Sequence, residues 1–257
     1  ATGQVMVLDT AFIFSFVVTN PSSHQNASEA TVEATGTALV PVSRGAMTTD
    51  IADRLGVTDG GKSNKVLIPA FGISSVRQSN PAPSVLNKIT ISLSSNCNLA
   101  PKSSVTITGL LGSINASSTN VSVDSIYSSD AFGSYAQWTQ STGTLVLNST
   151  GAGVLAGLTY DVSFILINPA LDQSSPAISV SASITDEFGS VVGYISSSAM
   201  TKPGLSLYGV SNGTDPLHVV TPTFNLKSIR QTLPYLVQTI QLSYRCKRTM
   251  IWLRVAG

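Results

Sequence analysis

Charged residues are scarce in this chain of 257 residues, at 11% of the total, where a soluble domain usually has about a quarter. Solubility must therefore come from Ser, Thr, Asn and Gln side chains, or from attached sugar. This profile favours an extracellular β protein over a cytosolic enzyme. We expect an extracellular or cell-surface location.

Basic residues are also missing where nucleic-acid binding would need them. Up to Asp215 the chain has thirteen acidic and eight basic residues, and beyond it six basic and no acidic ones. Nucleic-acid-binding proteins gather their basic residues on one face of the fold. Because the excess here is confined to the tail, we expect no nucleic-acid partner.

Cysteines and long apolar runs are few. Cys97 and Cys246 permit one disulfide without requiring it. The apolar stretch AFIFSFVV (11–18) is too short to span a bilayer and lacks the charged flank of a secretory signal. We expect no membrane insertion within this segment, and either a removed signal or an internal fragment would explain the start at Ala1.

What the chain does contain is an internal repeat. FSFVVTNPSSHQNASEATVEA (14–34) returns as VSFILINPALDQSSPAISVSA (162–182), at an offset of 148 residues. Phe16 then matches Phe164, and we expect the two side chains to have like surroundings.

After a length change of five residues the match resumes at an offset of 153. LGVTDG (55–60) meets YGVSNG (208–213), and VLIPAFGISSVRQSNP (66–81) meets VVTPTFNLKSIRQTLP (219–234). Chance similarity in a biased composition predicts neither a constant offset nor matched Pro, Phe, Arg and Gln. The repeat predicts three parts: the C-terminal part of a first copy (1–65), one full copy (66–218) and the start of a further copy (219–257).

The tail from about residue 235 departs from this repeat. Residues 236–257 should resemble 83–103, but they do not. A slip of one nucleotide near Tyr235 permits the reading PGANNTIKLQVQTYDDLAPGS, with the free bases chosen to favour the match. This reading agrees with 83–103 at seven positions, including Asn87. We interpret the basic tail as translation in the wrong frame, in which case Cys246 and Trp252 carry no function.

Alternating apolar and polar residues, separated by turn residues, predict β-strands and no convincing helix. The predicted strands are 87–95, 103–112, 143–149, 159–168, 177–185 and 190–198. Their spacing is typical of an all-β fold with an antiparallel β-sandwich, jelly-roll or Ig-like, as the repeat module. We expect the strand with FILI (164–167) to be covered on both faces, 128–138 to hold one short helical turn, and 70–87 to be a linker that enters a strand.

Three stretches resemble a known kind of module: N-x-I-T-x-x-L…L-A-P-x-S-x-V-T-I-T-G-L, W-x-x-x-T-G-T-L and Y-x-x-S-F-x-L-x-N-P, within 87–198. They are similar to the tandem Ig-like or cohesin-like β-sandwich repeats of large extracellular or surface proteins of algae, other protists and bacteria. The resemblance implies a structural or adhesive role. It carries over no catalytic residue.

Catalytic motifs are weak. GVSNG (209–213) fits the G-x-S-x-G nucleophile elbow with Ser211, but that motif needs a strand-to-helix turn and partner residues. Thr58 stands at the matching position of the other copy, so both stretches are interpreted as turns. His24 and His218 match Asp172 and Lys65, and we interpret them as surface residues. We expect no enzyme and no cofactor, with a secreted hydrolase as the less favoured reading.

Other sites are possible on a secreted protein. Five sequons offer glycosylation at Asn26, Asn115, Asn120, Asn148 and Asn212. Acidic turns could hold calcium through Asp186 and Glu187, or through Asp50, Asp53 and Asp59, although no loop supplies the series of an EF-hand.

Aromatic residues gather at Tyr127, Phe132, Tyr135 and Trp138. Tyr127, Tyr135 and Trp138 could stack on sugar rings, although core packing is the more common role of such a tryptophan.

The pairs Arg77-Gln78 and Arg230-Gln231 recur, and they predict a surface clamp at the junction between modules. The leading hypothesis is therefore a non-catalytic structural or adhesive repeat module, whose partners are neighbouring repeats or copies of itself. The alternative is a module for carbohydrate binding or calcium-assisted adhesion, with glycans as partners.

Overall fold

The computed structural model describes residues 9–35, 41–125, 131–186, 188–231 and 242–248. Within these ranges every regular element is a β-strand, except the single 3₁₀ turn η1 at Gln140–Thr142. The predicted all-β class is confirmed. The chain divides into two compact units, one made of residues 1–52 and 59–68 and the other of residues 53–58 and 69–257.

The first unit is built around one hairpin. β1 (Thr31–Ala34) pairs antiparallel with β2 (Val42–Ala46). Gln25 forms an isolated bridge with Val66, in which each backbone N–H donates to the other residue's carbonyl at 2.9 Å. Val32 in β1 stays 55% exposed, so the hairpin buries little apolar surface within the described residues.

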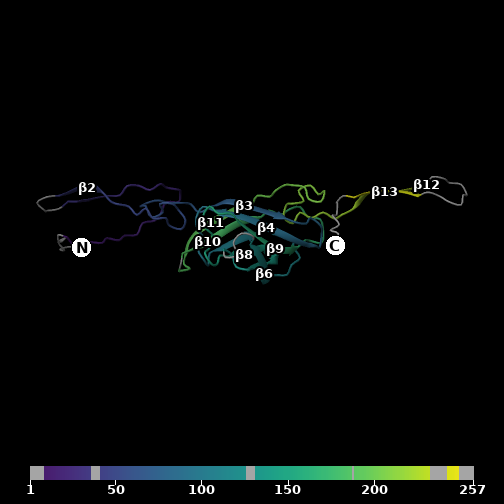
Figure 1. The fold of residues 1–257 in the computed structure, drawn as a ribbon, viewed down its shortest axis with the longest axis horizontal. Coiled ribbons are helices and arrows are strands. Elements are labelled where there is room, and N and C mark those ends of the chain that lie inside the picture. Colours follow the sequence, from purple (N-terminus) through teal and green to yellow (C-terminus); the bar gives the residue numbers. More distant parts are fainter. Residues whose placement is uncertain (1–8, 36–40, 126–130, 187, 232–241, 249–257) are drawn as a thin grey trace. The chain divides into compact units, whose positions relative to one another are not determined.

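In the second unit, nine strands form one antiparallel sheet in the order β11-β10-β5-β8-β7-β6-β9-β4-β3 (Figure 1). Their bounds are β3 Phe71–Gln78, β4 Leu86–Ser95, β5 Ser104–Thr108, β6 Ser118–Ser125, β7 Tyr135–Thr139, β8 Thr144–Asn148, β9 Tyr160–Ile167, β10 Ser179–Thr185 and β11 Val191–Ala199. The same unit contains a separate hairpin of β12 (Phe224–Gln231) and β13 (Leu242–Arg248).

The large sheet is nearly barrel-shaped because its two edges meet. Thr201, just beyond β11, forms a parallel bridge with Ser75 of β3. The Thr201 N–H donates to the Ser74 carbonyl at 2.9 Å, and the Val76 N–H donates to the Thr201 carbonyl at 3.0 Å.

The predicted sandwich implied two separate sheets, whereas this sheet is continuous. The cause lies in β6, which serves both walls: residues 118–122 pair with β7, and residues 123–125 pair with β9.

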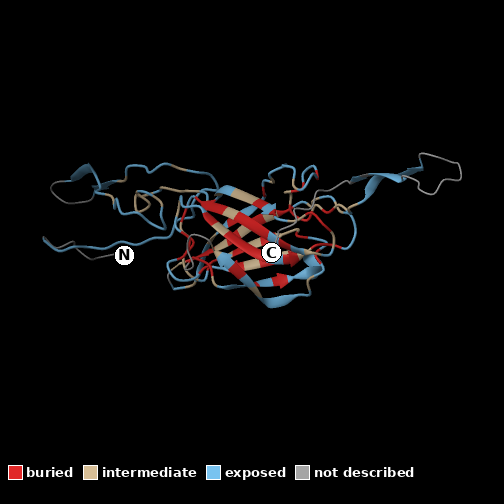
Figure 2. Ribbon diagram, turned by 45° about the vertical axis from the view of Figure 1, so that its right-hand side comes forward, coloured by how far each residue is buried: buried red, intermediate tan, exposed pale blue. Residues whose placement is uncertain are grey.

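Buried residues follow the strands of this sheet (Figure 2). They alternate with more exposed residues along β5, β7, β8 and most of β10, as expected where one face meets the core. Buried apolar side chains include Ile89, Ile91 and Leu93 of β4, Val105 and Ile107 of β5, Leu145 and Leu147 of β8, Val162, Phe164 and Leu166 of β9, and Val180 and Ile184 of β10. The expectation that FILI is covered on both faces is wrong, because Ile165 between Phe164 and Leu166 is 45% exposed.

All six predicted strands are present, as β4, β5, β8, β9, β10 and β11, but three further strands of the sheet were missed. The expected linker at 70–87 contains β3, and Tyr135–Thr139 of the expected helical turn forms β7. β3 (FGISSVRQ) and β6 (STNVSVDS) carry few apolar residues. Their extended state comes from pairing with neighbouring strands, which local patterning does not report.

Several registers recur at the offsets of the sequence repeat. Thr31↔Ala46 in β1–β2 corresponds to Ser179↔Ala199 in β10–β11, and both hairpins have a register irregularity one pair further along. The pairing of β12 with β13 follows that of β3 with β4 at an offset of 153, from Phe71↔Ser95 and Phe224↔Arg248 onward.

The loops at 53–65 and 206–218, which the predicted repeat aligns, also share their backbone geometry. Left-handed φ values occur at matching positions, namely Leu55 (50°), Asp59 (55°) and Asn64 (59°) against Tyr208 (52°), Asn212 (55°) and Leu217 (55°). Matched residues of the two aligned segments are not always equally buried. Phe164 is 2% exposed in β9 between β4 and β6, whereas Phe16 is 84% exposed and lies in no strand, so their expected like surroundings are not found.

Candidate functional site

Three buried amide side chains in the second unit are joined to one another by hydrogen bonds. Gln78 ends β3, Asn87 lies in β4 and Asn168 follows β9; they are 5%, 0% and 0% exposed. The Asn87 Nδ2 donates to Gln78 Oε1 at 2.8 Å and to Asn168 Oδ1 at 2.7 Å. We call these three residues the amide cluster.

Backbone groups satisfy the remaining polar atoms of Asn87 and Asn168. The Asn168 Nδ2 donates to the carbonyls of Asn80 and Ala82, both at 2.7 Å. The Asn87 Oδ1 accepts from the N–H groups of Ser79 and Asn80 at 3.1 and 3.2 Å. Burial of these amides is tolerated because their donors and acceptors have partners, and removal of one member leaves some buried polar atoms of its neighbours unpaired.

Gln78 extends the amide cluster to the loop near the end of the unit. Its Nε2 donates to the carbonyls of Gly213 at 2.9 Å and His218 at 2.8 Å, and its Oε1 accepts from the Leu217 N–H at 2.7 Å. Asn168 in turn donates its backbone N–H to the Val85 carbonyl at 3.0 Å. Side-chain amides thus tie the end of β3 and the beginning of β4 to the 213–218 loop.

Of the four residues in the predicted Arg-Gln surface clamp, Gln78 does not lie at the surface. In β3, Val76 and Gln78 point into the core, so Gln78 is buried and holds a loop of its own unit, while Arg77 between them is exposed. On β12, Arg230 and Gln231 are both exposed. The recurrence of Gln78 and Asn168 in the sequence was a usable signal, but nothing marked Asn87, because its match lies in the anomalous tail.

A second recurring glutamine closes the loop in both copies. Gln173 forms a bridge with Val219, as Gln25 does with Val66. The Gln173 Nε2 donates to the Leu217 carbonyl at 3.1 Å, and the Gln25 Nε2 donates to the matching carbonyl of Asn64 at 2.7 Å. The two glutamines therefore have the same structural role.

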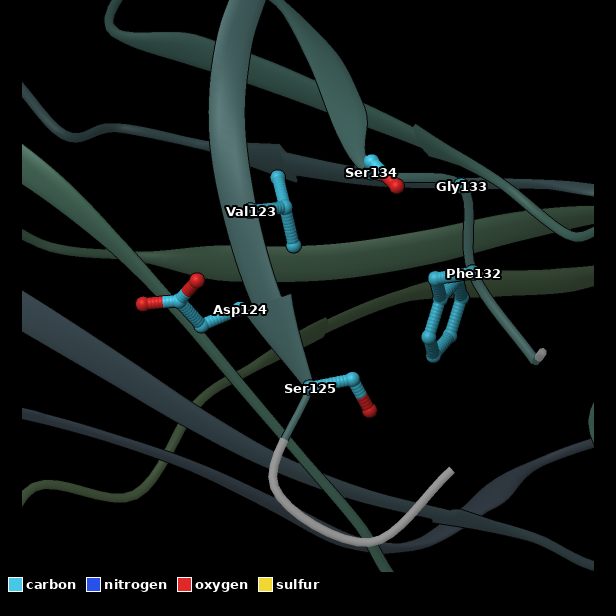
Figure 3. Close-up of a pocket in the computed structure, with 6 residues that line it drawn as sticks. All are labelled: Val123, Asp124, Ser125, Phe132, Gly133 and Ser134. Carbon is cyan, nitrogen blue, oxygen red and sulfur yellow. The ribbon is translucent and has the colours of Figure 1, made fainter. Parts of the chain in front are cut away.

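A recess of about 240 Å³ lies beside the end of β6. Its lining residues are Val123, Asp124, Ser125, Phe132, Gly133 and Ser134. Figure 3 shows Ser125 and Phe132 on one side of the strand and the Asp124 carboxylate on the other. The Ser125 Oγ is buried without a hydrogen-bond partner among the described residues. These six residues offer one carboxylate and no second acid or base, so they do not form the acid–base pair of a hydrolase.

The predicted aromatic strip for sugar stacking is not formed by Trp138. Trp138 is 2% exposed, and its Nε1 donates to the Asn115 carbonyl at 3.1 Å. Phe132 is equally buried and packs edge-on against Tyr160, with 6.3 Å between ring centroids. Tyr135 is 61% exposed, because it alternates with buried neighbours along β7. Tyr127 lies outside the described residues.

The sequons differ in how free their asparagines are. Four are exposed, namely Asn26, Asn120, Asn148 and Asn212. Asn115 is half-buried, and its Oδ1 accepts from the Ile167 N–H and from the Ser113 Oγ, the latter at 3.0 Å. Sugar is attached to Nδ2, and a half-buried asparagine leaves less room for it than the four exposed ones.

The acidic turns are hydrogen-bonded within themselves. The Asp186 Oδ1 accepts from the N–H groups of Phe188 at 3.0 Å and Ser190 at 2.8 Å, which caps the turn between β10 and β11. Glu187 lies outside the described residues. In the part of the chain that is described, no three metal-binding side chains gather.

At the other acidic turn, Asp50 Oδ1 accepts from the Ala52 N–H at 2.9 Å. Lys62 lies 2.9 Å from Asp59, and this hydrogen bond and the positive charge hold the pKa of Asp59 below its usual value.

Cys97 is 4% exposed and a free cysteine, so the permitted disulfide with Cys246 is not formed here. Burial raises the pKa of the Cys97 thiol, which keeps it protonated and unreactive. The side chain of Cys246 lies outside the described residues.

Ser211 is not on a nucleophile elbow. The preceding residues form the tight turn Leu207↔Val210 of a loop, and no α-helix occurs among the described residues. Ser211 is exposed and His24 is exposed, whereas His218 is half-buried beside Val219.

No helix in the described ranges is long and apolar enough to cross a membrane. Neither the protein-family models nor the curated proteins contain a match to this chain.

Proposed function

We propose that this chain is a non-catalytic structural or adhesive part of an extracellular or cell-surface protein, built from tandem copies of one repeat. The observation that carries the proposal is the recurrence of backbone geometry at the offsets of the sequence repeat. The Gln25↔Val66 bridge and the Gln173↔Val219 bridge use matched residues, and the loops that they close share left-handed residues at three matched positions.

The surface of the module suits a long-lived extracellular role. Hydroxyl groups pair across β5 and β10, with 2.9 Å between Ser104 Oγ and Ser183 Oγ and 3.0 Å between Thr108 Oγ1 and Ser179 Oγ. These paired side chains are half-buried, and the face is polar without being charged. In finer detail we propose a sandwich-type module whose two walls are joined through β6.

The amide cluster suits a module that transmits tension along an array. Gln78 lies near the start of the full copy (66–218) and the 213–218 loop lies at its end, and three hydrogen bonds join them. A pulling force applied at the two ends would be carried by these bonds together with the ladder between β3 and β4. We therefore favour a spacer role over a catalytic one for a module that contains the amide cluster.

Sequencing the gene on both sides of this segment tests the proposal. We expect further copies with a spacing of about 150 residues, each with counterparts of Gln78, Asn87 and Asn168. A gene whose flanks hold no further copy would contradict the array.

A further inference from the structure

We propose that the turn at residues 53–58, the plug, joins one copy of the repeat to the body of the next, with Asn98 as its receptor. This inference rests on the proposed function, because it names the partner of the plug as a neighbouring copy of the same repeat. By sequence the plug belongs to the closing loop of the first copy. By contacts it belongs to the second unit, although residues 1–52 and 59–68 on either side form the first.

Asn98 holds the plug through its backbone. The Asn98 N–H donates to the Leu55 carbonyl at 2.7 Å. Its Oδ1 accepts from the Ala156 N–H at 2.8 Å, which fixes the side chain against the loop before β9. Asn98 is thus bonded to the plug on one side and to the folded sheet on the other.

Gly56 allows the closest approach of the plug to this receptor. Its φ is +72°, and a Cβ built at Gly56 would lie 2.2 Å from Asn98 Oδ1 and 2.8 Å from the Ala156 Cβ. Glycine is therefore required at this position for two reasons, the left-handed backbone and the lack of space.

The stretch around Asn98 is held in the second unit by several backbone hydrogen bonds. Next to Asn98, Leu99 and Val154 exchange two backbone hydrogen bonds of 2.8 and 2.9 Å. Asn96, two residues earlier, binds Ala70 twice: its N–H donates to the Ala70 carbonyl at 3.0 Å, and its Oδ1 accepts from the Ala70 N–H at 2.9 Å. The stretch 96–98 therefore holds both the plug and the segment that leads into β3.

The second copy has a plug of the same form. Arg54 and Val57 bond to each other at 3.1 and 2.9 Å, and Leu207 and Val210 do so at 3.0 and 2.9 Å. Between them, Leu55-Gly56 and Tyr208-Gly209 share left-handed φ values, with +72° at Gly56 and +81° at Gly209. In the array, the plug at 207–210 would meet the Asn98 counterpart of the following copy.

A pair of glycine variants of the full chain tests the plug. Gly157 has a φ of +76° and nothing within 4 Å of a built Cβ, so Gly157→Ala carries the same backbone strain as Gly56→Ala without the collision. The readouts are the rate of trypsin cleavage after Arg54, followed by mass spectrometry, and hydrogen exchange at the Asn98 amide. We expect Gly56→Ala to raise both rates about tenfold or more, and Gly157→Ala to leave both within about twofold.

A second variant keeps the test decisive if Gly56→Ala impairs folding. Asn98→Ala keeps the backbone N–H that bonds to Leu55 but removes Oδ1, which fixes this stretch to the Ala156 N–H. It should therefore loosen the hold on Leu55 and raise cleavage after Arg54, and in combination it should lessen the effect of Gly56→Ala, because Oδ1 is the atom that the new Cβ meets first. Equal behaviour of the Gly56→Ala and Gly157→Ala variants, or no effect of Asn98→Ala, would overturn the plug and leave the array untouched. Flanking sequence without further copies would overturn the array, while the contact between Leu55 and Asn98 would remain.

Discussion

The side chains of Asn87 and Asn168 meet in a hydrogen bond of 2.7 Å, and neither is exposed to solvent. Asn87 comes from β4 and Asn168 from the end of β9, strands that pair directly. Their contact closes the ladder at the point where β9 gives way to the Asn-Pro loop. It also connects Gln78, and through it the 213–218 loop, to the centre of the sheet.

Asn168→Ala should lower the free energy of unfolding by about 3 kcal/mol, because it leaves one of the two donor hydrogens of Asn87 Nδ2 and two backbone carbonyls without a partner in a buried site. Urea unfolding of protein made without glycosylation measures this change. Asn120→Ala on the exposed part of β6 is the matched control, with an expected change within about 0.5 kcal/mol. Equal effects of the two substitutions would contradict a structural role for the amide cluster.

Gln78→Leu should release the loop at 213–218 while the sheet stays folded. The substitution keeps the volume but removes the acceptor of the Leu217 N–H and the donor to Gly213 and His218. Hydrogen exchange at the Leu217 amide should become at least about tenfold faster. Arg77→Leu, on the adjacent exposed position of β3, should leave that rate unchanged. If the Leu217 amide stays protected in the Gln78→Leu variant, Gln78 does not hold the 213–218 loop.

Glycosylation should occur at exposed sequons and not at Asn115. Expression through a eukaryotic secretory pathway, followed by glycosidase treatment and mass spectrometry, measures occupancy at each site. We expect mass shifts at some of Asn26, Asn120, Asn148 and Asn212, and none at Asn115, because Asn115 is half-buried and a sugar on its Nδ2 would have to displace its neighbours. Absence of any shift would argue against the extracellular proposal.

The transcript across codons 233–237 should show a frame change. In the alternative frame, position 240 reads Asn, the counterpart of Asn87 at an offset of 153, where the printed chain has Ile240. An isoleucine can neither accept from two backbone N–H groups nor bond to a glutamine, as Asn87 does. A gene that runs in register through this region, without a break or a homopolymer, would contradict the frame-change hypothesis.

Strands with strong alternation could be predicted from the sequence, whereas strands defined by their neighbours could not. β4 and β9 carry buried Ile, Leu, Val and Phe at every second position. β3 and β6 are rich in Ser, Gly and Asn, and only their partners in the sheet fix them. The continuous sheet was likewise out of reach, because it depends on the division of β6 between β7 and β9 and on the bridge from Ser75 to Thr201.

The candidate site was predictable in part, and the repeat was the source of what could be predicted. The recurrence of Arg77-Gln78 led to a prediction for Gln78, but the charged neighbour suggested a surface position, and Asn168 was not predicted although it recurs as well. Arg77 and Gln78 point to opposite faces of β3, because adjacent side chains in a strand alternate between the faces of the sheet. Trp138 was predicted for either core or surface, and the alternation of β7 places it in the core.

The central claim is that two parts of this chain, about 150 residues apart, fold the closing loop alike. Backbone carbon chemical shifts from NMR test this most directly, because they distinguish a left-handed residue from an extended one. We predict left-handed shifts at Leu55, Asp59 and Asn64 that match those at Tyr208, Asn212 and Leu217. Extended or random-coil shifts at the first three residues, beside left-handed shifts at the second three, would contradict the account.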